Sequence, residues 1–203
     1  MTIIIALKDK KNKRIIFGSD RQYSTGIIKG VVKNKIVTKK VNIIDAYYNE
    51  IDTKEIHIGF SGTGFIAELV EYNFNVPDMN EKQEFMEYLY ENFLEELRET
   101  LIDKKLSGTS NEVFDSGSNI IIVFQDEIYE IFSNFSVNKI TGDYAVSGAG
   151  YEIAIGSLYT NLHYHKKLDY VEVVRQALTA CGVNTLYCDT NLDIKTIDYH
   201  DQG

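Results

Sequence analysis

The spacing of apolar residues changes several times along the chain, and the order of these changes limits the folds that the sequence can adopt. Short runs rich in β-branched residues indicate strands, whereas apolar residues three or four positions apart indicate amphipathic helices. The runs from Thr2 to Lys8 and from Arg14 to Ser19 are joined by a polar segment and predict a hairpin. Further strands are predicted at Ile36 to Thr38, Val41 to Ile44, Glu55 to Ser61, Asn119 to Phe124, Glu127 to Phe132 and Tyr144 to Val146.

Helical patterns occur as two pairs between these strands. The first pair has apolar stripes from Phe65 to Phe74 and from Phe85 to Leu101. The second pair has a stripe from Ile155 to Leu162, followed by a helix predicted from the capping pattern at Asp169 to the stop at Gly182. Each pair is long enough to cover one face of a sheet.

The resulting order is strands, two helices, strands, two helices and a closing strand, which we place at Thr185 to Asp189. This order favours two antiparallel sheets stacked on each other with helices outside each sheet. We therefore predict an α+β fold, a four-layer αββα sandwich. A chain of 203 residues with 44% apolar content can bury one substantial core, so we expect a single domain over residues 1–203.

Charge and composition exclude several classes of function. The formal net charge of −9 repels polyanions, so we expect no nucleic-acid partner. No stretch approaches the roughly 20 apolar residues that span a bilayer, and the first residues lack the pattern of a signal peptide. With only two cysteines, Cys181 and Cys188, the sequence predicts a protein of the reducing cytoplasm, without a membrane association.

Several short motifs occur in register with a known family. They are Thr2-Ile-Ile-Ile-Ala-Leu at the start, Gly18-Ser19-Asp20 after the first hairpin, Lys39-Lys40-Val41, Ile58-Gly59-Phe60-Ser61-Gly62, and the stretch from Ala177 through Asn191. In this order they resemble the proteasome β-subunit and HslV-like family of N-terminal-nucleophile (Ntn) hydrolases. The similarity covers nearly the whole chain, and it depends on several weak matches rather than on one specific motif.

The resemblance implies that Thr2 is the nucleophile once Met1 has been removed. A threonine hydroxyl is a poor nucleophile at neutral pH, but at a chain terminus its own α-amine, with a pKa of about 8, can accept the hydroxyl proton. The small second residue suits removal of Met1. Without the family pattern, Thr2 would simply be the first residue of an edge strand.

The resemblance also implies a lysine beside Thr2 and an aspartate that holds it. We assign Lys40 to this position, with Lys39 and Lys35 as rivals, because neighbouring strand residues face opposite sides and the family places the second of its paired lysines inward. The cation would lower the pKa values of the amine and hydroxyl and stabilise negative charge. Asp20 would keep the lysine charged and oriented. A solvated strand lysine and an ordinary turn aspartate are the alternatives.

Gly59 is the candidate for the oxyanion contact. Its backbone N–H would stabilise the tetrahedral intermediate, a contact worth about 3 to 4 kcal/mol of barrier lowering. A glycine allows the substrate to approach the backbone closely. The alternative is a strand glycine at a bulge.

Two features depart from the family. Ala149, in Gly148-Ala149-Gly150, stands where proteasome-like peptidases have a serine, so a hydroxyl that assists the site is missing. The segment between Asp20 and Lys40 is also longer than in the family, which leaves the substrate-binding stretch around Tyr23 to Gly30 unassigned.

Three functions remain open. The first is a threonine endopeptidase that cleaves peptides or unfolded proteins inside a homo-oligomeric ring, with an ATP-dependent unfoldase as a possible partner. The second is a proteasome-like scaffold ring that has lost catalysis. The third is an Ntn amidohydrolase of a small amide, which needs no ring. We expect no cofactor and no metal, because His163-Tyr164-His165 lacks carboxylate partners and the two cysteines suit packing.

Overall fold

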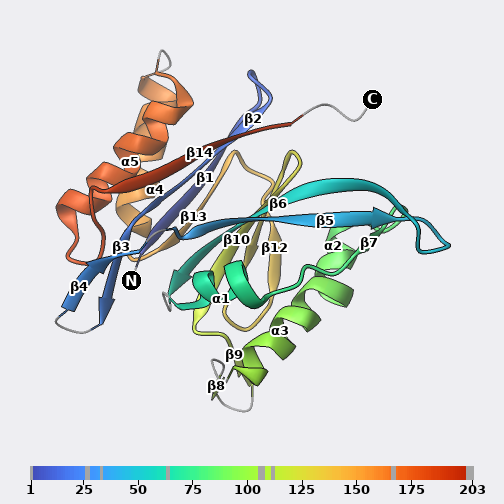
Figure 1. Cartoon of the computed structure of the whole chain (residues 1–203). Coiled ribbons are helices and arrows are strands. Elements are labelled where there is room, and N and C mark those ends of the chain that lie inside the picture. The colour runs from blue at the N-terminus through green and yellow to red at the C-terminus, as the bar shows by residue number, and fades with distance from the viewer. Residues whose placement is uncertain are drawn as a thin grey trace.

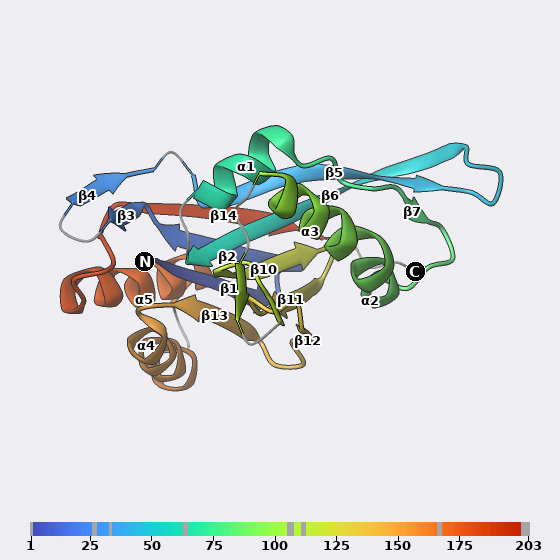
Figure 2. The same ribbon diagram turned by 90° about the horizontal axis from the view of Figure 1, so that it is seen from below.

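Two β-sheets stack face to face in the computed structural model, and helices cover the outer face of each sheet (Figure 1). The structure describes residues 2–25, 28–32, 34–62, 65–104, 108–110, 113–165 and 168–199. Figure 2 shows the layers from below, with α4 and α5 on one side of the strands and α1 to α3 on the other. The predicted αββα sandwich is confirmed.

The first sheet has the strand order β13-β1-β2-β14. Its members are β1 (Ile3–Asp9), β2 (Arg14–Asp20), β13 (Tyr144–Gly148) and β14 (Leu192–Asp198). The hairpin of β1 and β2 pairs Ile4 with Ser19, and β13 pairs Gly148 with Ile3. All pairs in this sheet are antiparallel. The start of β1 and the ends of β2 and β13 therefore meet at one edge of the sandwich.

The second sheet has the order β12-β11-β10-β6-β5-β7. Its strands are β5 (Ile36–Ile44), β6 (Glu50–Gly62), β7 (Met79–Asn80), β10 (Ser118–Phe124), β11 (Glu127–Ile131) and β12 (Val137–Lys139). The short β7 pairs with β5 in parallel, and the other pairs are antiparallel. Two small ribbons flank the sheets: β3 (Gln22–Thr25) with β4 (Ile28–Val31), and β8 (Gly108–Ser110) with β9 (Val113–Asp115).

The helices fall into two separate layers. On the second sheet lie α1 (Phe65–Asn73), α2 (Phe85–Tyr88), the π-helical segment η1 (Leu89–Phe93) and α3 (Leu94–Asp103). On the first sheet lie α4 (Tyr151–Tyr164) and α5 (Tyr170–Asn184). Asp169 is the N-cap residue of α5 but makes no side-chain capping bond, because its carboxylate pairs with Arg14 instead.

Alternation along β1 explains why the core has separate compartments. Ile3, Ile5 and Leu7 point toward α4 and α5, whereas Ile4 and Ala6 point toward the second sheet. All of these side chains are fully buried, because apolar layers cover both faces of the strand. The sequence of a strand that is buried on both faces is a continuous apolar run. The sequence from Ile3 to Leu7 shows such a run.

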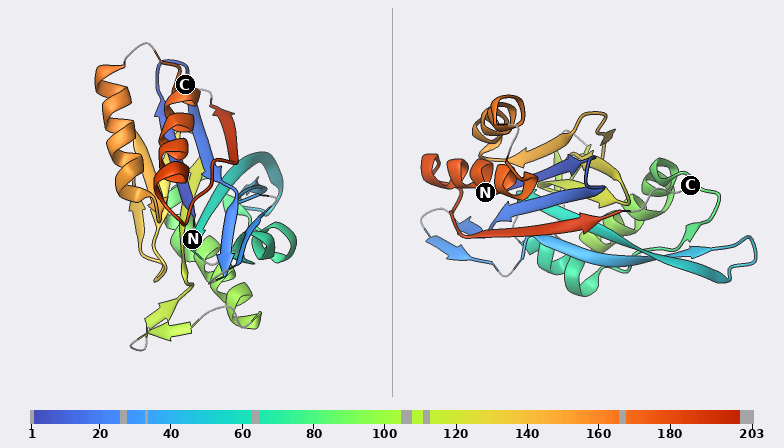
Figure 3. Two further views of the ribbon diagram at one scale, coloured as in Figure 1. Left: turned by 90° about the vertical axis from the view of Figure 1, so that its left-hand side faces the viewer. Right: turned by 90° about the horizontal axis from the view of Figure 1, so that it is seen from above.

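The hairpin of β5 and β6 extends past the body of the molecule (Figure 3). Its tip is held by Asp45, whose Oδ1 accepts hydrogen bonds from the backbone N–H of Tyr47 at 2.8 Å and of Asn49 at 2.9 Å. Tyr47 and Tyr48 are exposed at this tip. The turn is therefore ordered by its own polar contacts rather than by packing against the core.

The predicted closing strand at Thr185 to Asp189 is wrong. These residues form a loop after α5, and β14 begins later, at Leu192. Backbone groups of the loop bond to residues near the end of β2: Asp189 N–H donates to Asp20 Oδ2 at 3.2 Å, and Leu186 carbonyl accepts from Gln22 Nε2 at 3.1 Å. These long-range hydrogen bonds take the place of the strand pairing that was predicted here. No local sequence pattern indicates them.

Gly59 provides a test of how closely the sheets approach. A Cβ atom added to it would lie 2.6 Å from Phe17 Cζ and 3.1 Å from Ile4 Cγ2, inside the core between the sheets. We expect Gly59→Ala to lower the free energy of unfolding by about 1–3 kcal/mol, because overpacking forces neighbours to shift. Gly142→Ala is the control, since nothing lies within 4 Å of an added Cβ there. Equal chemical denaturation midpoints for both variants would contradict this packing.

Candidate active site

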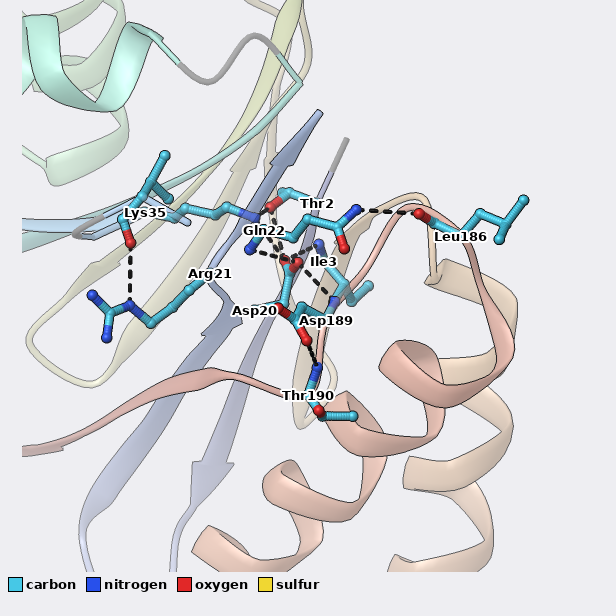
Figure 4. A network of polar contacts seen from close by, with 10 residues as sticks. Thr2, Ile3, Asp20, Arg21, Gln22, Lys35, Leu186, Asp189 and Thr190 are labelled. Atoms are coloured by element: carbon cyan, nitrogen blue, oxygen red, sulfur yellow. Dashed lines mark hydrogen bonds and ion pairs between the residues drawn. The ribbon is translucent and has the colours of Figure 1, made fainter. Parts of the chain in front are cut away.

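Thr2, Asp20 and Lys35 meet in a buried cluster at the edge of the sandwich (Figure 4). Thr2 Oγ1 donates a hydrogen bond to Asp20 Oδ1 at 2.8 Å, and Lys35 Nζ lies 2.8 Å from the same oxygen. Lys35 Nζ also donates to Thr2 Oγ1. The exposed fractions are 3% for Thr2, 0% for Asp20 and 5% for Lys35, so the three groups interact away from bulk water.

The elements explain how these residues come together. Thr2 directly precedes β1 and Asp20 ends β2, so pairing of the two strands brings both residues to the same edge. Lys35 directly precedes β5 in the other sheet. The cluster therefore joins the two sheets through one carboxylate.

Backbone donors hold the Asp20 carboxylate in place. Oδ1 accepts from Ile3 N–H at 3.0 Å, and Oδ2 accepts from Gln22 N–H and from Asp189 N–H, both at 3.2 Å. A buried carboxylate needs such partners, because an unpaired charge away from water is strongly unfavourable. Asp20 is thus fixed in position, and it orients both Thr2 and Lys35.

Burial changes the chemistry of Lys35. Removal from water lowers the pKa of its ammonium group, and the charge of Asp20 opposes part of this effect. A lysine with a lowered pKa exchanges protons more readily near neutral pH than a solvated lysine does. Burial and the Asp20 carboxylate therefore act on the pKa of Lys35 in opposite directions, and burial has the larger effect.

The structure does not place Lys40 beside Thr2, and the predicted position is corrected to Lys35. Lys40 is exposed on β5 and stands opposite Glu55 of β6. Five strand residues span about 16 Å, so Lys40 lies far along the strand from Lys35. The alternation rule decides the face of a strand residue but not its position along the strand. Lys39, the other rival, donates to the Glu71 carbonyl of α1 at 2.9 Å.

One feature of the sequence points to Lys35. The segment between Asp20 and Lys40 is longer than the matching segment of the family. The segment between Asp20 and Lys35 is shorter, so Lys35 removes this difference in length. Gly59, the candidate for the oxyanion contact, is not among the described residues that line the pocket beside Thr2. Gly59 faces the core between the sheets, at Phe17 and Ile4, whereas Gly62 lines the pocket next to Thr2.

A pocket of about 360 Å³ opens beside Thr2. Its walls come from the end of β6, the segment joining β9 to β10, and the end of β13. Ala149 is part of this wall, and its backbone N–H donates to the Thr2 carbonyl at 2.7 Å. The position where the family has a serine therefore lies directly beside Thr2, and this chain has no hydroxyl there.

A second cavity, of about 690 Å³, lies between the β5–β6 hairpin, β7 and the start of α2. It is larger, but none of Thr2, Asp20 and Lys35 lines it. Volume alone does not identify a reactive site, and the smaller pocket, which contains Thr2, is the candidate site.

Other candidate groups have structural roles. His163 Nδ1 contacts the Tyr159 carbonyl at 2.9 Å, and its ring stacks on that of Tyr159. Within the described residues, no cluster of His, Cys, Asp and Glu side chains has the arrangement of a metal site. Cys181 and Cys188 are buried free thiols, and burial raises the pKa of Cys181 to about 12. No described helix combines the length and apolar character needed to cross a membrane.

No known family profile matches the chain, and no curated protein matches its sequence. Solved structures do match its fold. Thiobacillus denitrificans BPH in complex with epoxomicin has a TM-score of 0.74 and 15% identity, covering 99% of this chain and 100% of that one. A second Thiobacillus denitrificans BPH structure has a TM-score of 0.75 at 15% identity, and the match covers 98% of this chain and 99% of that one. Eukaryotic HslV from Trypanosoma brucei has a TM-score of 0.62 at 16% identity, covering 98% and 100%. The chain therefore has the fold of the BPH and HslV structures, as the resemblance of its sequence to an HslV-like family predicts.

Proposed function

We propose that the chain is the subunit of a threonine peptidase that cleaves peptide bonds with Thr2 after Met1 is removed. The observation that carries this proposal is the buried cluster in which Thr2 Oγ1 contacts both Asp20 and Lys35 beside an open pocket. Met1 itself lies outside the described residues. Its removal would free the α-amine that the reaction needs.

In the proposed reaction, Thr2 Oγ1 attacks the carbonyl carbon of the scissile bond. Its proton passes to the α-amine of Thr2, directly or through water. The Lys35 ammonium stabilises the negative charge that develops on the attacking oxygen, and Asp20 keeps the lysine in place. The protonated amine then gives its proton to the leaving amine as the C–N bond breaks. Water hydrolyses the resulting ester and restores Thr2.

The oxyanion of the tetrahedral intermediate needs a donor in the pocket. Gly62 lines this pocket, so its backbone N–H takes the role that the sequence assigned to Gly59. Gly59 keeps a packing role between the sheets. Each residue is a glycine because another group approaches it closely.

Ala149 favours a second candidate function. Because the family serine is absent next to Thr2, a proteasome-like scaffold that kept the fold and lost catalysis is the main alternative. A small-amide hydrolase would share the chemistry of Thr2 without assembly into a ring. The experiments below separate these functions.

Covalent labelling tests Thr2 directly. BPH has been described in complex with epoxomicin, and an epoxyketone reacts with a free N-terminal threonine, so it is a suitable probe. We expect the intact mass of the purified native chain to show loss of Met1 and addition of one epoxomicin. Thr2→Ser should still react, because serine supplies the same hydroxyl, and Thr2→Ala should not. Retained Met1 without an adduct would establish the scaffold function instead.

Lysine substitution tests the corrected assignment. We expect Lys35→Met to lower kcat/KM for a fluorogenic peptide by at least about 100-fold, because it removes the cation next to the developing charge. Lys40→Met, a matched change on an exposed strand residue, should stay within about twofold. Thermal melts of both variants would show whether each folds. Equal activity of two folded variants would remove Lys35 from the site.

Assembly is the third test. By its fold, we propose that the chain works as a homo-oligomeric ring in the cytoplasm, acts on peptides or unfolded proteins, and can receive them from an ATP-dependent unfoldase. Sedimentation velocity of the native protein should give a single species of several subunits, because an enclosed chamber needs a closed ring. A monomer that still reacts with epoxomicin would instead indicate a small-amide hydrolase.

A further inference from the structure

Three glycines with a left-handed backbone meet at the pocket beside Thr2. Their φ angles are 124° at Gly62, 68° at Gly117 and 117° at Gly148, and no other described glycine has a positive φ. All three line the pocket. Residues other than glycine rarely adopt a backbone conformation with positive φ, and such conformations are frequent at functional sites.

Direct backbone contacts fix the walls of this pocket. A Cβ atom on Gly62 would lie 2.4 Å from the Gly117 carbonyl oxygen, and one on Gly148 would lie 2.0 Å from the Thr2 carbonyl oxygen. The ends of β6 and β13, the turn before β10 and the nucleophile therefore touch without intervening side chains. Backbone contacts therefore fix this part of the pocket wall.

Asp115 is the one ionisable side chain among the described residues that line this pocket. It ends β9, is half-buried, and its Oδ1 accepts a hydrogen bond from Gly117 N–H at 2.8 Å. In the described part of the chain, no lysine or arginine forms an ion pair with it. Arg98 stacks on the neighbouring Phe114 ring at 5.4 Å, and adjacent strand residues face opposite sides.

The other residues of the wall carry no charge. Ser61 Oγ contacts Ser147 Oγ at 2.8 Å and lies 3.4 Å from the Asn119 carbonyl. Ser118 and Ser133 complete this side. A pocket of about 360 Å³ with such walls has room for one long polar side chain.

We propose that this pocket binds the side chain of a substrate lysine or arginine directly next to the scissile bond, and that Asp115 selects it. The inference deepens the proposed peptidase function and rests on it. A cationic group beside Asp115 forms a charge-assisted hydrogen bond, which is stronger than a bond between neutral groups. The formal net charge of −9 also attracts cationic peptides to the chain.

Cleavage of matched peptides measures this selection. The substrates are internally quenched peptides that differ only in one residue beside the cleaved bond, lysine or glutamine, on either side. On one side, we expect kcat/KM for lysine to exceed that for glutamine at least about tenfold, as a hydrogen bond to a charged group allows. Asp115→Asn should bring this ratio close to one. The control Asp52→Asn, on the exposed β5–β6 hairpin, should keep the wild-type ratio.

A binding measurement separates this inference from the peptidase function. The amide resonances of Gly117 and Ser118 are followed by NMR during titration with the blocked tripeptides Ala-Lys-Ala and Ala-Gln-Ala. Shifts with the lysine peptide alone, lost in Asp115→Asn, would support the pocket even if no peptide were cleaved. Cleavage with equal rates for lysine and glutamine would overturn the role of Asp115 and leave the peptidase intact. Equal resonance shifts with both tripeptides would also overturn the role of Asp115.

Discussion

The ion pair between Asp20 and Lys35 is the contact on which the arrangement of the site depends. It joins the end of β2 in one sheet to the residue before β5 in the other, at 2.8 Å and almost without exposure. Two charges are costly to remove from water, and their attraction compensates only where geometry and further hydrogen bonds are good. Here the backbone N–H groups of Ile3, Gln22 and Asp189 supply those bonds. The pair therefore fixes the relative position of the two sheets where Thr2 lies.

The surrounding fold makes this edge available. Apolar side chains fill the space between the sheets and the space under each helix layer, so the middle of the sandwich is closed. At the edge, glycines replace larger residues, and chain segments approach through their backbones. Thr2 thus lies where the apolar core ends and a pocket begins. This position combines a buried setting for Lys35 with an open pocket beside Thr2.

The layer order could be predicted from the sequence because each layer has its own apolar period. Ile3 to Leu7 forms an unbroken apolar run because both of its faces are covered, and the helical stripes from Phe65 and Ile155 mark the two outer layers. Thr2 and Asp20 could be predicted together because a short hairpin brings its ends close. The sequence pattern favoured Lys40, and Lys35 could not be recognised, because alternation along a strand gives the face of a residue but not its position along the strand. The loop from Thr185 to Asp189 bonds to Asp20 across a large separation in sequence, and no local pattern reports such a contact.

Residue 2 is held on several sides at once. Its hydroxyl bonds to Asp20, its carbonyl accepts from Ala149, and the next N–H along the chain bonds to Asp20 as well. None of these contacts uses the nitrogen atom of Thr2. Cleavage of the bond before this residue would therefore create a new charge without releasing any of the contacts that position the hydroxyl. Removal of Met1 would then change the chemistry of residue 2 within a fixed geometry, because folding of the chain already orders the groups around its hydroxyl.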